Sequence, residues 1–144
     1  MAKSRLERFV NAQETDYDTA LSEIRAGRKR THWMWYIFPQ VEGLGFSETS
    51  RYYAVKGIAE AEHYFRHPLL GQRLIQISNE LLHLDTSDAT AIFGSPDDLK
   101  LKSCMTLFAL VPQTDPVFAS VLSKFFGGRM DELTVRLIAS GRSG

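Results

Sequence analysis

Three of the five prolines, each directly behind a residue that can begin or end a helix, most constrain what this chain can fold into. They stand in the pairs His67-Pro68, Ser95-Pro96 and Asp115-Pro116. Proline is favoured at the first helical position, because the N–H that it lacks has no helical partner there. Behind each pair, apolar residues recur at three- and four-residue spacing, which predicts a helix with one buried face.

The rest of the chain carries the same helical pattern. Four further helices are expected: one over residues 6–24 that ends at Gly27, one from a cap at Ser47 or Ser50 to residue 65, one over 89–93 behind a cap at Ser87, and one behind Asp131. The buried faces are expected to include Leu99 and Leu133. No segment alternates apolar and polar residues ahead of a hairpin turn. The sequence therefore predicts an all-α fold, a single compact globular domain of about six to eight helices over residues 1–144.

The composition is that of a soluble domain. A chain of 144 residues can bury one core without disulfides or metals. Lysine plus arginine equals aspartate plus glutamate at 17 each, so no overall field draws the protein to nucleic acid or membrane. The single cysteine, Cys104, excludes an internal disulfide and fits a reducing cytosol. Because no apolar stretch resembles a signal peptide or a membrane span, we expect a cytoplasmic protein that does not bind membranes.

Residues 27–40, called the basic–aromatic segment below, combine positive charge with aromatic rings. Three consecutive cations precede a histidine and both tryptophans of the chain: Arg28, Lys29, Arg30, His32, Trp33 and Trp35. Guanidinium and ammonium groups bind phosphate, and indole faces stack on rings or cations, so this mixture suits a nucleotide-like anion. The alternative is structural: the cations neutralise the end of the preceding helix, and the tryptophans belong to the core.

One histidine and two neighbouring aspartates are the candidate catalytic residues. The adjacent cations would favour the neutral imidazole of His32, which can accept a proton as a general base; otherwise His32 is a structural hydrogen-bonding residue. Asp97 and Asp98 could orient that base, bind a divalent cation or act as an acid. The alternative for both is that Ser95 caps a helix and the two carboxylates occupy its first turn, where the helix dipole stabilises negative charge.

No metal site is predicted. His63 and His67 have the i, i+4 spacing of a zinc pair, but no third ligand follows at a recognisable spacing. Cys104 lies within an apolar stretch, which favours packing over nucleophilic chemistry. There is no glycine-rich phosphate loop, and the sequence implies no particular cofactor.

Seven segments, in order along the chain, carry a family resemblance: Arg8-Phe9 with Ala12-Gln13 and Tyr17; Gly27 to Gln40; Gly43-Leu44-Gly45 with Ser47; His67-Pro68 with Leu70-Gly71 and Arg73-Leu74; Ile92-Phe93-Gly94 with Pro96-Asp97-Asp98 and Lys100; Met105-Thr106-Leu107-Phe108; and Lys124-Phe125-Phe126 with Asp131. Together they resemble the bacterial domain-of-unknown-function family 1810 over nearly the whole chain. The block His32 to Gln40 is very specific to it. The resemblance implies an all-helical fold and carries over no catalytic residue. The name calpastatin, sometimes given to its members, does not fit, because a calpain inhibitor is a disordered, aromatic-poor chain.

The first interpretation is a domain that binds a small anionic or nucleotide-like ligand, with or without catalysis. Its pocket would combine two segments of the chain: Lys29, His32, Trp33, Trp35, Gln40, Asp97 and Lys100. Arg28 and Lys29 would hold the anion, and a tryptophan would stack on a ring. The side chains expected to orient the ligand by hydrogen bonds are Gln13, Tyr17 and Gln40.

The second interpretation is a protein-interaction module that uses the surface of residues 28–40, since tryptophan and arginine dominate interface hot spots. Nucleic-acid binding is disfavoured, because the net charge is zero and no second basic stripe accompanies Arg28 to Arg30. Geometry separates the first two interpretations. A concave pocket around His32, Trp35 and Asp97 favours a ligand, and a flat exposed patch favours a protein partner.

Overall fold

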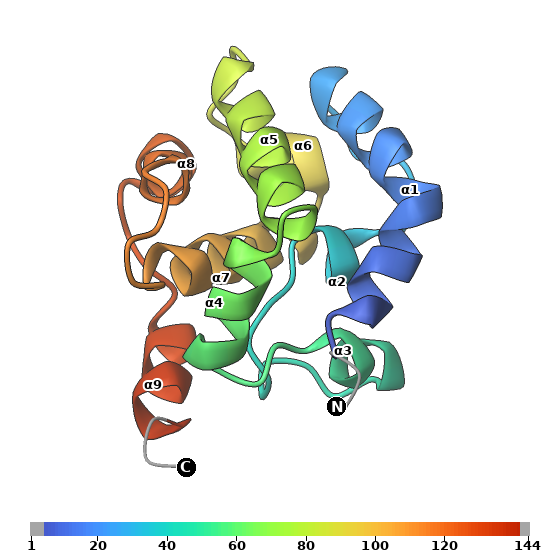
Figure 1. Ribbon diagram of the computed structural model, residues 1–144. Helices are drawn as coiled ribbons and strands as arrows, with labels where there is room; N and C mark the ends of the chain where they lie inside the picture. The colour runs from blue at the N-terminus through green and yellow to red at the C-terminus, as the bar shows by residue number, and fades with distance from the viewer. Residues whose placement is uncertain (1–4, 142–144) are drawn as a thin grey trace.

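Helices joined by loops build the part of the chain that the structure describes, residues 5–141 of a computed structural model (Figure 1). In order, the helices are α1 (Glu7–Arg25), α2 (Met34–Ile37), α3 (Glu48–Tyr53), α4 (Ile58–Arg66), α5 (Leu70–His83), α6 (Ala89–Phe93), α7 (Asp97–Ala109), α8 (Val117–Phe126) and α9 (Glu132–Gly141). Six of these have seven residues or more, and the predicted all-α fold is confirmed. No helix within residues 5–141 is long and apolar enough to cross a membrane.

The helix predicted to run to residue 65 is two helices, α3 and α4, with an extended turn between them. Ser47 begins α3, as one of the two predicted caps, and its hydroxyl accepts the N–H of residue 50 at 3.1 Å. The chain leaves the helical conformation at Ala54, because Val55 pairs in parallel with Val41. The Val55 N–H donates to the Gln40 carbonyl at 2.8 Å. This bridge fixes the loop that carries Gln40, and the apolar spacing gives no sign of it.

One core joins the helices, and α7 crosses its middle (Figure 1). α7 contacts α4, α6, α8 and α9, while α5 packs on α1, α4 and α8. Leu101, Cys104, Met105 and Phe108 are fully buried and have the spacing of one helix face. Burial raises the pKa of the Cys104 thiol well above its usual value, so the prediction that this residue serves packing is confirmed.

Two helices begin one residue later than the predicted caps, Ser87 and Ser95, imply. α6 begins behind Asp88 rather than Ser87, because Asp88 Oδ1 accepts the N–H groups of residues 90 and 91 at 3.0 and 3.2 Å. α7 begins behind Pro96, so Ser95 is not its cap. The first-turn position predicted for Asp97 and Asp98 is nonetheless confirmed.

Two leucines predicted to be core are on the surface instead. Leu99 is 58% exposed and Leu133 is 48% exposed. Leu99 lies in the first turn of α7, and Ser103, Thr106 and Leu107, which share its face, are buried further along the helix. Both leucines border a cleft described below.

Candidate functional site

A buried carboxylate, Glu23, holds the beginning of the basic–aromatic segment. α1 ends at Arg25, and Gly27 follows with a φ of +84°, which confirms the predicted helix end. Glu23 Oε1 accepts the N–H groups of residues 30 and 31 at 2.8 and 3.1 Å, and the indole N–H of Trp33 at 2.9 Å. Its Oε2 accepts the hydroxyl of Thr31 at 2.7 Å. One side chain therefore fixes both the loop and the Trp33 ring, which is only 1% exposed.

The electrostatic state of Glu23 follows from these contacts. Burial alone would raise its pKa, but the hydrogen bonds from the backbone, Thr31 and Trp33 outweigh burial and lower the pKa to about 2. Glu23 is therefore charged at neutral pH, and its charge is part of what holds the segment in place.

The two segments predicted to form a pocket do meet in space. The Lys29 ammonium lies 3.0 Å from Asp97 Oδ2, and the Lys29 N–H donates to the Ile92 carbonyl at 2.7 Å. Between them is a concave pocket, called the lysine–tryptophan pocket below, lined by Lys29, His32, Trp33, Met34, Trp35, Tyr36, Thr49, Asp97 and Lys100. Six of the sequence-predicted site residues are thus brought together.

Asp97 bridges the two lysines of this pocket. Its Oδ1 accepts from Lys100 at 2.9 Å, while its Oδ2 faces Lys29. Each ammonium also lies over an indole: Lys29 Nζ is 5.1 Å from the Trp33 ring centre, and Lys100 Nζ is 4.2 Å from that of Trp35. Burial would raise the pKa of Asp97, but its hydrogen bonds and charge attraction to the two lysines lower it. Two cations thus share one carboxylate, which leaves the cluster with one excess positive charge.

The other two candidate catalytic residues are placed differently. His32 is exposed at the pocket wall. Among the contacts of residues 5–141, no hydrogen bond or ion pair joins its imidazole to Asp97 or Asp98. Asp98 instead accepts the hydroxyl of Thr90 at 2.7 Å, which ties α7 to α6. Both oxygens of Asp97 are engaged by lysines, so neither aspartate orients His32 in this arrangement.

Three predicted ligand-binding residues lie outside the pocket. Gln13 is buried, and its Nε2 donates to the Tyr36 carbonyl and the Tyr64 hydroxyl at 2.8 and 2.9 Å. Tyr17 donates to the Arg73 carbonyl at 3.0 Å, so it joins α1 to α5. Arg28 is exposed and is not among the residues that line the pocket.

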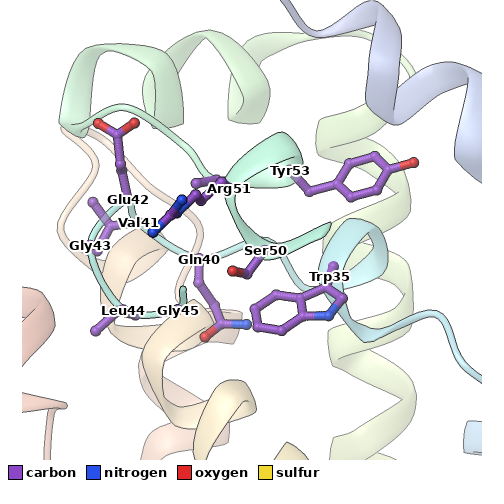
Figure 2. A pocket seen from close by; sticks show the side chains of 11 residues that line it. Trp35, Gln40, Val41, Glu42, Gly43, Leu44, Gly45, Ser50, Arg51 and Tyr53 are labelled. Carbon is purple, nitrogen blue, oxygen red and sulfur yellow. The ribbon is translucent and has the colours of Figure 1, made fainter. Parts of the chain in front are cut away.

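Gln40 lies in an adjoining hollow, called the Gln40 cleft below. Its walls include Trp35, Gln40, Gly45, Phe46, Leu99, Lys100 and Leu133. Figure 2 shows the Gln40 amide directed toward the Trp35 indole, with Ser50 close by. Trp35 and Lys100 line both hollows, so the cleft and the lysine–tryptophan pocket share a wall.

The sequence gives few signals for the residues missed by the prediction. Glu23 stands among exposed charged residues of α1, and no pattern marks it as the anchor of residues 30–33. Leu99 offers none, since Ser103, Thr106 and Leu107 lie on the same face of α7 and are buried. Gly45 does offer a signal. A Cβ there would lie 2.7 Å from the Ser50 side chain and 3.3 Å from the Trp35 ring, so only glycine permits this approach.

Comparison with known proteins confirms the family resemblance. Residues 3–138 match the DUF1810 family, described as a protein of unknown function. The crystal structure of the conserved hypothetical protein Rv1873 from Mycobacterium tuberculosis is similar, with 45% sequence identity and a TM-score of 0.91. The match covers 93% of this chain and 96% of that one. No curated protein matches the sequence. The chain belongs to the DUF1810 family.

Proposed function

We propose that this protein is a cytoplasmic domain that binds a small anionic, nucleotide-like ligand in the lysine–tryptophan pocket. One observation carries the proposal: His32, Trp35 and Asp97, from segments far apart in sequence, line one concave pocket together with two lysines. Ligand sites are concave and combine apolar walls with a few polar groups, whereas protein-binding patches are flatter.

The lysines supply the part of the pocket that would hold an anion. Lys100 carries three N–H donors and gives one of them to Asp97 Oδ1. A phosphate oxygen would add a charge-assisted hydrogen bond and balance the excess positive charge of the cluster. Asp97 would keep both ammonium groups in position before the ligand arrives, which lowers the cost of binding.

Trp35 supplies the apolar wall for a ring. Trp33 is buried and already hydrogen-bonded to Glu23, so it serves as support rather than as a stacking surface. His32 is the group that would accept a proton if the bound ligand reacts. Both oxygens of Asp97 are bound to Lys29 and Lys100, so Asp97 does not orient His32 as a base. We therefore propose ligand binding, and not catalysis, as the function of the pocket.

A thermal-shift screen tests the proposal. The purified protein is screened against nucleotides, sugar phosphates, dinucleotide cofactors and divalent metals. A ligand at 100 times its dissociation constant adds about 2.7 kcal/mol to the stability of the native state. We expect an anionic hit, lost in Lys100→Ala and weakened in Trp35→Ala. Lys102→Ala is the matched control, because this residue lies on the same helix but is not among the lining residues.

The second candidate function is a protein-interaction module. Phe46, Leu99 and Leu133 favour it, since these exposed apolar side chains border one hollow. The exposed cations Arg28 and Arg30 lie on the basic–aromatic segment, which was predicted as its contact surface. If no compound in the thermal-shift screen stabilises the protein, that result would contradict the ligand proposal and favour the interaction module. A pull-down would then be the next experiment.

A further inference from the structure

Three tyrosines line a shallow hollow beside the lysine–tryptophan pocket, called the tyrosine hollow below. Its lining residues are Tyr36, Glu48, Thr49, Tyr52 and Tyr53. The first lies on α2 and the other four lie on α3. Tyr36 and Thr49 also line the lysine–tryptophan pocket, so the two hollows are neighbours. The tyrosine hollow differs from that pocket in its chemistry, because none of the described residues that line it is a lysine or an arginine.

The rings of this hollow are arranged as two outer rings beside a central one. The centre of the Tyr53 ring lies 5.1 Å from that of Tyr36 and 4.8 Å from that of Tyr52. The planes of these two pairs meet at 51° and 82°. Within residues 5–141, no ring contact joins Tyr36 to Tyr52, and the Tyr52 side chain is exposed. The three rings therefore line the hollow at different angles, as the rings of an aromatic cage do.

The cations of the protein lie over other rings. Within the described part of the chain, a lysine or arginine lies over each of six rings, those of Phe9, Tyr17, Trp33, Trp35, Phe125 and Phe126. None of these contacts involves a tyrosine of the hollow. Arg8 donates to the Tyr52 carbonyl at 2.7 Å, but its guanidinium is buried and pairs with Glu60 at 3.4 Å. No described cation of the protein itself therefore occupies the faces of these three rings.

Two carboxylates give the region of the hollow negative charge. Glu48 is exposed and lines the hollow, and no ion pair within residues 5–141 involves it. Asp16, on α1, accepts the hydroxyl of Tyr36, which fixes that ring and places a second negative charge next to it. Aromatic faces and carboxylates attract the same kind of group, an organic cation.

We propose that the tyrosine hollow is a second ligand site, which binds an organic cation of the alkylated ammonium class. Such a cation carries its charge on a surface of methyl groups, which suits contact with ring faces. A metal ion would need several oxygen ligands, and no group of acidic, histidine or cysteine side chains within residues 5–141 supplies them. The site does not depend on the anion proposed for the lysine–tryptophan pocket.

Titration of the full-length protein with choline, followed by NMR of the backbone amides, tests the inference. The reference probe is dimethylbutanol, the neutral isostere of choline in which carbon replaces the charged nitrogen. We expect choline to bind about tenfold or more tightly than this alcohol, equivalent to about 1.4 kcal/mol. Tyr52→Ala should weaken choline binding about fivefold or more, whereas Tyr52→Phe keeps the ring and should bind as the wild type. Glu48→Gln should weaken choline and leave the neutral probe unchanged.

Two changes outside the hollow are the matched controls. Phe46→Ala and Glu42→Gln alter exposed residues of the loop before α3 that are not among the lining residues, and both should bind choline as the wild type. Lys100→Ala, which alters the neighbouring pocket, should not weaken choline binding. If Tyr52→Ala fails to fold by circular dichroism, Glu48→Gln at its exposed position takes its place.

The same cationic group occurs in free choline-like compounds and on a methylated lysine of a protein partner. A short peptide with one trimethylated lysine is therefore titrated in parallel, and tighter binding of the peptide or of choline identifies the source. Equal affinities for choline and dimethylbutanol would overturn the inference, and so would choline binding that is absent, or unchanged in both Tyr52→Ala and Glu48→Gln. Each of these results would leave the proposed function standing.

Discussion

Single residues decide the shape of this site, and Glu23 does so most clearly. Its carboxylate accepts four hydrogen bonds from residues 30, 31 and 33, and these contacts turn a charged loop and a large ring into one fixed unit. The sequence marks the loop through its cations and tryptophans, but the anchor lies seven residues or more upstream on α1. Residue types thus predicted which segment lines the candidate pocket, whereas the hydrogen bonds that hold this segment could not be read from them.

The acid sensitivity of the protein should depend on Glu23. Its pKa is about 2 when folded, against an ordinary value of 4.5, so its stabilising effect is fully present above pH 4.5 and is lost as the pH falls toward 2. This difference corresponds to about 3 kcal/mol of unfolding free energy. We expect Glu23→Gln to be less stable at pH 7 and to lose less stability on acidification, as measured by urea unfolding at a series of pH values.

The matched control for this prediction is Glu14→Gln, an exposed glutamate on the same helix. Its pH profile should follow that of the wild type. A Glu23→Gln profile parallel to the wild type between pH 5 and 2.5 would contradict the role of this carboxylate.

Replacing Gln40 should affect stability in the opposite direction to replacing Glu23. Because its buried amide donor has no hydrogen-bond partner among residues 5–141, replacing it with leucine removes an unfavourable group without breaking a bond. We expect Gln40→Leu to keep or raise the free energy of unfolding, by up to about 1 kcal/mol. Chemical denaturation measures this directly, and a loss of 2 kcal/mol or more would show that the amide has a structural role.

At the scale of helices, the spacing of apolar residues predicted most of the buried positions. Contacts between distant segments decided where the remaining helices break. The buried face of α7 at residues 101, 104, 105 and 108 is visible in the sequence, and so is the end of α1 at Gly27. The break between α3 and α4 is not visible, because it depends on the pairing of Val41 with Val55 across a loop. The surface position of Leu99 is not visible either, because Ser103, Thr106 and Leu107 share its face of α7 and are buried.

Gly71 marks a close approach between two helices. A Cβ at this position would lie 1.9 Å from the Phe65 carbonyl oxygen, at the junction of α4 and α5. Because the obstructing atom belongs to the backbone, the helices would have to move apart. We expect Gly71→Ala to lower the free energy of unfolding by about 3 kcal/mol in thermal or urea denaturation.

Gly141→Ala provides the comparison for this helix junction. No atom lies within 4 Å of a Cβ added there, so the higher helix propensity of alanine should leave stability unchanged or slightly improved. Equal stability of the two alanine variants would contradict the close packing of α4 on α5.

For the whole molecule, the central result is that residues 27–40 and 97–100 form one concave surface. The sequence indicated both segments as chemical candidates, but their meeting depends on the packing of α6 and α7 beside the basic–aromatic segment. The same packing left Gln13, Tyr17 and Arg28 outside the pocket, because α1 turns its glutamine and tyrosine toward other helices. Together the two hollows offer positive charge, an indole wall and the Gln40 side chain within one small region.

Tryptophan emission during titration with nucleoside 5′-monophosphates tests this account most directly. Trp35 lines both hollows, while Trp33 is buried, so a bound ring should alter the emission of Trp35. We predict a saturable change in the wild type that is absent in Trp35→Phe, weakened in Lys100→Ala and unaffected in Lys102→Ala. Emission that stays constant in the wild type up to millimolar nucleotide, or a change that persists in Trp35→Phe, would contradict a ligand site at this wall.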